Sequence, residues 1–144
     1  MSRRLCGRWQ VWAALLSLCG PQGHAQTADS GFQLPSGRLH CSYNPGDAQQ
    51  PASMRCDVLE PSFRRPPNGT CPLDFGDSLA LTTRGRPHWV CHGDTVLDPQ
   101  HPVLAYGQTW SWGGFRCTSA TTGVRCVNIA GHGFELARRA YRLF

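Results

Sequence analysis

Short runs in which apolar and polar residues alternate follow one another along most of the chain. In residues 88–92, alternation places Trp89 and Cys91 on one face of a strand, with both histidines on the other. No stretch of about 12 residues carries a helical period. The strands predicted from these runs are Arg38 to Tyr43, Met54 to Leu59, Leu79 to Thr83, Pro87 to His92, Gln108 to Trp112, Phe115 to Ser119, Val124 to Ile129 and Phe134 to Leu136.

Eight short strands separated by Gly, Pro, Asn and Asp predict an all-β fold. We expect a small, disulfide-stabilised antiparallel sandwich or barrel-like sheet, with a short C-terminal helical turn at residues 138–143. Around the Gly113-Gly114 turn, the pattern predicts a common buried set. Its members are Trp110, Trp112, Phe115 and Cys117.

The first 25 residues have the pattern of a secretory signal peptide. A basic start is followed by an apolar stretch from Trp9 to Cys19, and cleavage is expected before Gln26. Lipidation of Cys19 is disfavoured because Leu18 precedes it, where such sites prefer a small residue. We therefore expect one domain, residues 26–144, secreted or periplasmic, with no transmembrane segment.

The charge of residues 26–144 indicates no particular partner. These 119 residues contain 11 arginines, no lysine and 9 acidic groups, for a net charge of +2. Only Arg138, Arg139 and Arg142 cluster, whereas a nucleic-acid surface needs a dense basic stripe. Nucleic acid is therefore not an expected partner, no cofactor is indicated, and the ligand and oligomeric state stay open.

Six cysteines remain after the signal segment, which in an exported domain predicts three disulfides. The spacing favours sequential pairing, because each pair flanks a turn-rich segment between two strand-like runs. The predicted bonds are Cys41–Cys56, Cys71–Cys91 and Cys117–Cys126. A metal site is not expected, because the chain has no C-x-x-C pair, and His88 and His92 would lie roughly 13 Å apart on a strand.

Two short motifs match those of the GDSL family of serine esterases. Gly76-Asp77-Ser78-Leu79 has the letters of the nucleophile block, and Asp98-Pro99-Gln100-His101 has the D-x-x-H of the other triad members. Only 19 residues separate Ser78 from Asp98, too few for the crossovers of that fold, and the oxyanion-hole blocks are missing. We interpret the motif as a turn that leads into a strand.

The other candidate site residues divide into two hypotheses. A small hydrolase would combine His92 or His132 with Asp94 or Ser78. A structural role in the bend is favoured for His132, which lies between two glycines. A binding module would instead use tryptophans that stack against sugar rings or peptide side chains, although core packing is the commoner role in a small domain. The candidates are Trp89, Trp110 and Trp112.

Blocks spread over residues 32–144 resemble a family of bacterial exported proteins that is known only as a domain of unknown function. They include Pro35-Ser36-Gly37 before Cys41, Cys91-x-Gly93-Asp94-Thr95, Gly123-Val124-x-Cys126-x-Asn128, and Gly131-His132-Gly133-Phe134 followed by Leu136, Arg138 and Tyr141. Arg38, Phe75 and Ala137 depart from the family pattern. The resemblance implies export and a disulfide-bonded domain, and it implies no reaction. The favoured function is therefore a non-enzymatic binding or envelope-associated module.

Overall fold

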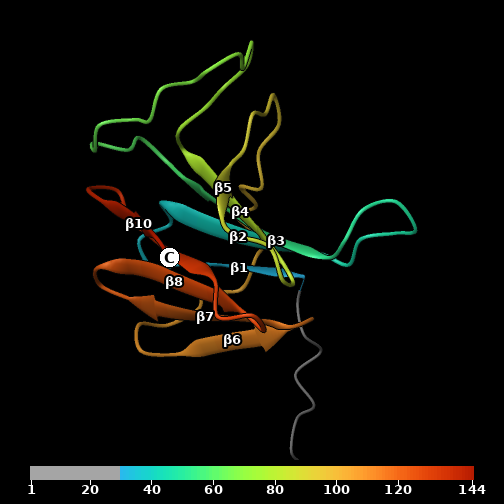
Figure 1. Ribbon diagram of the computed structural model, residues 1–144. Coiled ribbons are helices and arrows are strands. Elements are labelled where there is room, and N and C mark those ends of the chain that lie inside the picture. The colour runs from blue at the N-terminus through green and yellow to red at the C-terminus, as the bar shows by residue number, and fades with distance from the viewer. Residues whose placement is uncertain (1–29) are drawn as a thin grey trace, which may run out of the picture.

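The computed structural model describes residues 30–144, which form two five-stranded antiparallel sheets (Figure 1). The strands of the first sheet are β1 (Gly31–Gln33), β2 (Leu39–Asn44), β3 (Ser53–Val58), β4 (Ser78–Thr82) and β5 (His88–Trp89). Those of the second are β6 (Thr109–Trp112), β7 (Phe115–Ala120), β8 (Gly123–Asn128), β9 (Gly133–Leu136) and β10 (Tyr141–Leu143). Each sheet is a meander, because its strands pair in the order of the chain.

The predicted all-β class is confirmed, and each of the eight predicted strands has a counterpart, β5 being shorter than expected. The predicted helical turn at residues 138–143 is wrong. Ala137 donates a backbone hydrogen bond to Ala140, at 2.9 Å, which reverses the chain so that Tyr141 pairs with Leu136 on β9. The short edge strands β1 and β10 were not predicted.

The β6–β7 hairpin has a tight connection in the second sheet. Its two-residue turn is Gly113-Gly114, with φ angles of 57° and 89°, and Trp112 pairs with Phe115 across it. Positive φ at both positions is typical of the turn that suits the right-handed twist of a hairpin, and glycine adopts it without strain. This turn sets which side chains of β6 and β7 face outward.

The inner faces of the two sheets share one hydrophobic cluster. The first sheet contributes alternate residues of its strands, including Leu39, Met54, Leu79 and Leu81, and the second contributes Phe115, Val124, Phe134 and Leu136. These side chains are almost fully buried. Burial of this apolar surface, at roughly 25 cal/mol per Å², is the main force that holds the sheets together.

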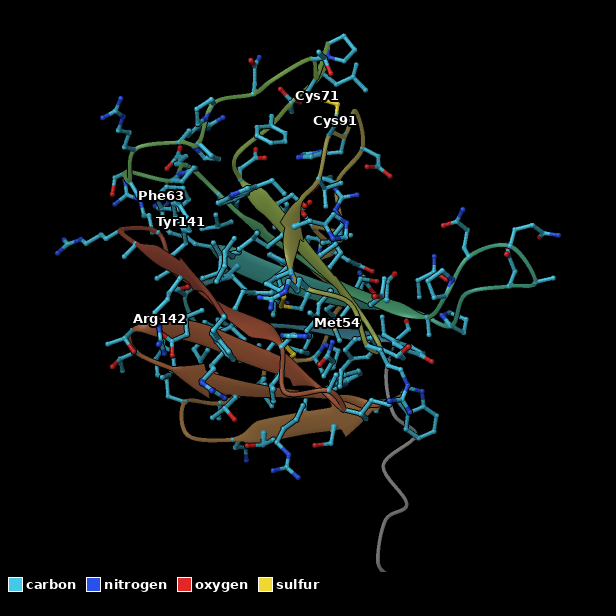
Figure 2. All side chains as sticks on the ribbon, viewed as in Figure 1. Met54, Phe63, Cys71, Cys91, Tyr141 and Arg142 are labelled. Atoms are coloured by element: carbon cyan, nitrogen blue, oxygen red, sulfur yellow. A yellow bond between two sulfur atoms is a disulfide. The ribbon has the colours of Figure 1, made fainter. Side chains whose placement is uncertain are left out.

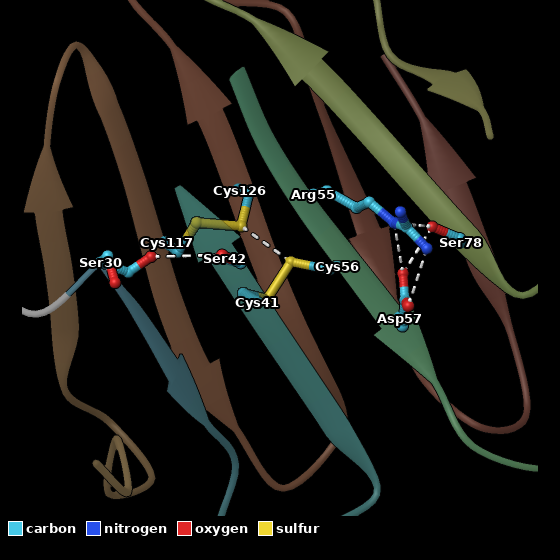
Figure 3. The surroundings of a disulfide bond; sticks show 9 residues. All are labelled: Ser30, Cys41, Ser42, Arg55, Cys56, Asp57, Ser78, Cys117 and Cys126. Carbon is cyan, nitrogen blue, oxygen red and sulfur yellow. Dashed lines mark hydrogen bonds and ion pairs between the residues drawn. A yellow bond between two sulfur atoms is a disulfide. The ribbon is translucent and has the colours of Figure 1, made fainter. Parts of the chain in front are cut away.

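All three predicted disulfides are present. Cys41–Cys56 joins directly paired residues of β2 and β3, and Cys117–Cys126 does the same for β7 and β8. The two bonds meet in the core, where Cys56 Sγ lies 4.0 Å from Cys126 Sγ (Figure 3). The four sulfur atoms thus form part of the contact between the sheets.

The third disulfide, Cys71–Cys91, joins the β3–β4 loop to the segment after β5, away from the core (Figure 2). An aromatic cluster fastens the long β3–β4 loop to the rest of the domain. The ring of Phe63 in this loop lies 5.0 Å from the ring of Tyr141 on β10, and Trp89 lies 4.8 Å from Tyr141. The cluster therefore bridges the edge strands of both sheets.

The expected signal peptide, with Cys19, lies in residues 1–29, outside the described residues. Across residues 30–144, no helix has the length and apolar character needed to cross a membrane.

Candidate functional site

Ser78 lies in a buried polar network on the outer face of the first sheet. Asp57 on β3 pairs with Ser78 on β4, and alternation places Arg55 on the same face as Asp57. The Ser78 hydroxyl donates to Asp57 Oδ1 at 2.5 Å and accepts a bond from Arg55 Nε at 2.8 Å. Arg55 also donates to both carboxylate oxygens of Asp57, at 2.9 and 3.0 Å. The hydroxyl is fully buried and its hydrogen is committed to Asp57.

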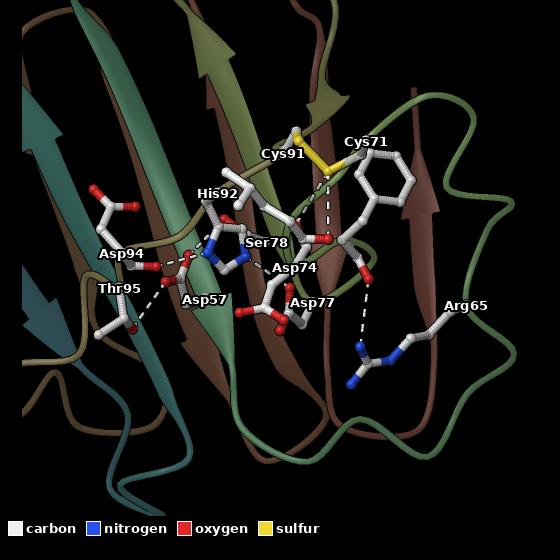
Figure 4. Close-up of polar contacts among 12 residues, drawn as sticks. Asp57, Arg65, Cys71, Asp74, Asp77, Ser78, Cys91, His92, Asp94 and Thr95 are labelled. Atoms are coloured by element: carbon white, nitrogen blue, oxygen red, sulfur yellow. Dashed lines mark hydrogen bonds and ion pairs between the residues drawn. A yellow bond between two sulfur atoms is a disulfide. The ribbon is translucent and has the colours of Figure 1, made fainter.

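The loop after β5 covers this network and completes its hydrogen bonds (Figure 4). Asp57 Oδ2 accepts bonds from the Thr95 hydroxyl at 3.1 Å and from the Val96 amide at 3.0 Å. Arg55 Nη1 donates to the Asp94 carboxylate at 2.8 Å, which lowers the pKa of Asp94. Burial lowers the pKa of Arg55, but its bonds to both carboxylates outweigh burial and raise it. The loop and the sheet are thus joined by charge-assisted bonds.

His92 lies beside the network and is paired with Asp77. Its Nε2 lies 2.8 Å from Asp77 Oδ1, and its Nδ1 lies 2.6 Å from the Asp94 carbonyl oxygen. Burial lowers the pKa of His92, but the bonds to Asp77 and to the Asp94 carbonyl together raise it above its usual value. The imidazole is hydrogen-bonded at both nitrogens and makes no hydrogen bond to Ser78 within residues 30–144.

The GDSL-like segment forms a turn and a strand. Gly76 has a φ of 87°, β4 begins at Ser78, and β4 pairs antiparallel with β5. The side chains of Asp77 and Ser78 bond to other side chains, Asp77 to His92 and Ser78 to Asp57. A serine whose hydrogen is donated to a carboxylate, with no histidine in contact, lacks the geometry of an activated nucleophile.

The remaining histidine candidates lie in other surroundings. His101 Nε2 is 3.9 Å from Asp98 Oδ2, so the two residues of the D-x-x-H motif lie close to each other. Neither residue hydrogen-bonds to Ser78 within residues 30–144. The backbone of His132 pairs with Asn128, whose side chain also accepts a bond from the His132 amide at 3.0 Å. No hydrogen bond of the His132 imidazole is found among the described residues.

Potential metal ligands gather in the core. The Sγ atoms of Cys41, Cys56 and Cys126 lie within 4.8 Å of one another. All three sulfurs belong to disulfides, and a metal ligand must be a thiolate. In this oxidised state they do not form a metal centre.

The three candidate tryptophans differ in exposure. Trp89 packs against Tyr141 and Phe63, and Trp110 packs against Phe32, with ring centroids 5.8 Å apart. Both indoles are half-buried beside the core. Trp112 is 51% exposed, so the prediction that it is buried with Trp110 is wrong. It lies at the end of β6, which is an edge strand of the sheet formed within residues 30–144.

A surface hollow of about 510 Å³ lies beside Trp112. Its lining residues come from the β6–β7 hairpin and the end of β8, namely Ser111, Trp112, Gly113, Gly114, Phe115, Arg116, Val127, Asn128 and Ile129. Ser111 pairs with Arg116, and Arg116 pairs with Val127, so these three side chains form a row on the outer face. Arg116 is exposed and has no ion pair within residues 30–144. Sequence reasoning missed Arg116 because one arginine in a strand carries no motif.

The fold and the disulfides define a small, all-β, disulfide-bonded domain. A model of a family of unknown function, DUF6636, matches residues 13–144, and the chain belongs to that family. This confirms the resemblance to a domain of unknown function. No curated protein and no solved structure shows significant similarity to the chain.

Proposed function

We propose that the chain is an exported, non-enzymatic binding domain, a sandwich of two sheets whose ligand occupies the hollow beside Trp112. Residues 1–25 are a cleaved signal peptide, and residues 26–144 act in the periplasm or outside the cell. The signal-like pattern supports export, as do the three disulfides, which persist in oxidising compartments.

The observation that carries the binding proposal is the 510 Å³ hollow next to a half-exposed tryptophan. Ligand sites are concave and mostly apolar, with a few polar groups that fix orientation. Here Val127, Ile129 and Trp112 provide apolar surface, and Ser111 and Arg116 provide the polar groups. Ile129 is 59% exposed and lies with Trp112 around one hollow, and apolar side chains gathered at one place on a surface are typical of a binding site.

The candidate catalytic residues Ser78 and His92 are buried and hydrogen-bonded within the protein. Ser78 is fully buried, and Arg55 and His92 are engaged with carboxylates. A substrate would have to displace the loop that carries Thr95 and Val96 before it reached Ser78. This arrangement supports a structural role for the network.

The test is an NMR titration of oxidised residues 26–144 with neutral and acidic oligosaccharides. We expect shifts of the amides that line the hollow and a loss of binding of at least about tenfold in Trp112→Ala, because an aromatic anchor is removed. The matched control is Tyr106→Ala, since Tyr106 is 43% exposed and does not line the hollow. Equal weakening by both substitutions would contradict the proposal.

Export is tested separately by mass spectrometry of the protein recovered from the periplasm or medium of an expressing bacterium. The expected mass is that of a chain that begins at Gln26. A chain that retains residues 1–25 would contradict signal cleavage.

A further inference from the structure

The outer face of the second sheet carries two parallel rows of mostly polar side chains. The row at the hollow is Ser111, Arg116 and Val127, and the next row is Thr109, Thr118, Arg125, Glu135 and Arg142, as the strand register fixes them. Alternation puts all these side chains on the side away from the core. The hollow therefore continues into a polar surface that crosses all five strands.

This face has an excess of positive charge. It carries three arginines, Arg116, Arg125 and Arg142, against one carboxylate, Glu135. Glu135 is shared, because Arg142 Nη2 lies 2.7 Å and Arg125 Nε lies 3.5 Å from Glu135 Oε1. The bond from Arg142 lowers the pKa of Glu135, so Glu135 stays ionised and neutralises one positive charge. Two positive charges remain on the face, one of them on Arg116.

The rows also offer hydroxyl groups between the cations. The hydroxyl oxygens of Thr109 and Thr118 lie 3.0 Å apart, and Ser111 lies beside Arg116 in the hollow. Arg116 and Arg125 occupy diagonal positions on neighbouring strands, where Cα atoms are roughly 7–8 Å apart. A ligand that crosses the strands would contact Arg116, then the hydroxyl groups of the threonine pair, then Arg125.

We propose that this face binds an acidic polysaccharide, a deepening that rests on the binding function proposed above. A sugar ring enters the hollow with its apolar side against Val127, which lies on the same face as Arg116, and against Ile129. Trp112, which pairs with Phe115, borders the hollow from the end of β6. Its carboxylate is held by Arg116, whose planar guanidinium suits bidentate carboxylate recognition. The chain of sugars then crosses Thr118 toward Arg125, and its hydroxyl groups bond to the threonine pair.

Other anionic polymers fit the face less well. Nucleic acid needs a denser basic groove, whereas this face has a carboxylate among its arginines. Of its aromatic side chains, Trp112 lies at the rim, and the ring of Phe144 lies against Arg125 and Arg142. An acidic peptide would add as a strand along the free edge of β6, but the hollow is built from β6, β7 and β8 and lies across the sheet.

The experiment is calorimetry on oxidised residues 26–144 with a galacturonic acid oligomer, the same oligomer as its neutral methyl ester, and an oligoglutamate peptide of equal charge. We expect the acid oligomer to bind at least about tenfold more tightly than its ester, and Arg116→Gln to remove most of that preference. The matched control is Arg84→Gln, an exposed arginine in the β4–β5 turn without an ion pair among residues 30–144. It should leave the preference unchanged.

The outcomes separate the two proposals. If acid and ester bind equally and Trp112→Ala weakens both, the hollow binds sugars but the inference of an acidic ligand is overturned. If oligoglutamate binds more tightly than the sugar acid, the polysaccharide is overturned in favour of a peptide. If neither Trp112→Ala nor Arg116→Gln changes the binding affinity for any of the three probes, both the inference and the proposed site fail.

Discussion

Arg55 and Arg116, on the outer faces of the two sheets, are in opposite surroundings. On the first sheet, Arg55 lies under a loop and bonds to Asp57, Ser78 and Asp94. On the second sheet, Arg116 is exposed beside the hollow and is free of ion pairs within residues 30–144. Figure 2 shows Arg142, another arginine of the second face, projecting away from the core.

The difference shows that residue type alone does not mark a functional site. The first face contains serine, histidine and aspartate, the residue types of a catalytic triad. In the folded protein, however, these side chains hydrogen-bond to one another and to their neighbours. On the second face, Arg125 and Arg142 share Glu135, whereas Arg116 at the hollow makes no ion pair within residues 30–144. Groups that are left without partners next to a hollow are better evidence for binding than groups that are satisfied.

The largest expected effect is that of Asp57→Ala on stability. The substitution leaves Arg55 without its main partner and removes acceptors for Ser78, Thr95 and Val96, so we expect a loss of about 3 kcal/mol. Denaturant unfolding measures it. The matched control on the open face is Glu135→Ala, where an exposed pair should contribute less than about 1 kcal/mol. Similar losses in both variants would contradict the contrast between the faces.

Ser78→Ala should lower the free energy of unfolding by about 1–3 kcal/mol, because it removes a buried hydroxyl that both donates and accepts. Ser111→Ala, at the open hollow, should change stability by less than about 0.5 kcal/mol. The same two variants are assayed for ester hydrolysis. Hydrolysis by the wild type that disappears in Ser78→Ala, with stability unchanged, would revive the hydrolase hypothesis.

The pH dependence of stability should report on His92. Its folded-state pKa is raised, so protonation stabilises the fold below the ordinary histidine value of about 6.5, and this contribution is lost as the pH rises through the folded-state pKa. Asp77→Asn removes the carboxylate partner and should flatten this dependence. Unfolding at a series of pH values, with the His92 pKa followed by NMR, measures both. A His92 pKa that does not fall in Asp77→Asn would contradict the assignment.

The smallest expected effect on stability is that of Arg116→Gln. It should change the free energy of unfolding by less than about 0.5 kcal/mol, as is usual for a surface residue without partners. Arg55→Gln makes the equivalent change on the first face, and it should destabilise the protein clearly because Asp57 loses its ion pair. Thermal and denaturant unfolding of the two variants compare the faces directly. A destabilised Arg116→Gln would show that Arg116 has a structural role.

Much of the fold was predictable because it depends on local patterns. Alternation located eight strands, and turn residues between cysteines indicated the sequential disulfides. The edge strands β1 and β10 were missed because three residues carry too short a pattern. At β10, pairing with β9 decides the conformation, and this pairing is not visible in residues 138–143 alone.

The candidate site was less predictable, because it depends on what covers each residue. Alternation assigned Trp112 to the same face as Phe115, but β6 is an edge strand of its sheet and Trp112, at its end, is 51% exposed. The network of Asp57 was also hidden, since Thr95 and Val96 lie 38 and 39 residues further along the chain. Such contacts arise from the loop packing on the sheet, which no local pattern encodes.

The most direct test of the central contrast is a chemical-shift map of the oxidised domain, residues 26–144, titrated with the galacturonic acid oligomer. We predict that the amides of Ser111 to Arg116, Val127 and Ile129 shift, with smaller changes at Thr118 and Arg125. The chemical shifts of the amides of Asp57, Ser78 and His92 should not change. Shifts that centre on Ser78 and His92, with the hollow unchanged, would contradict the account.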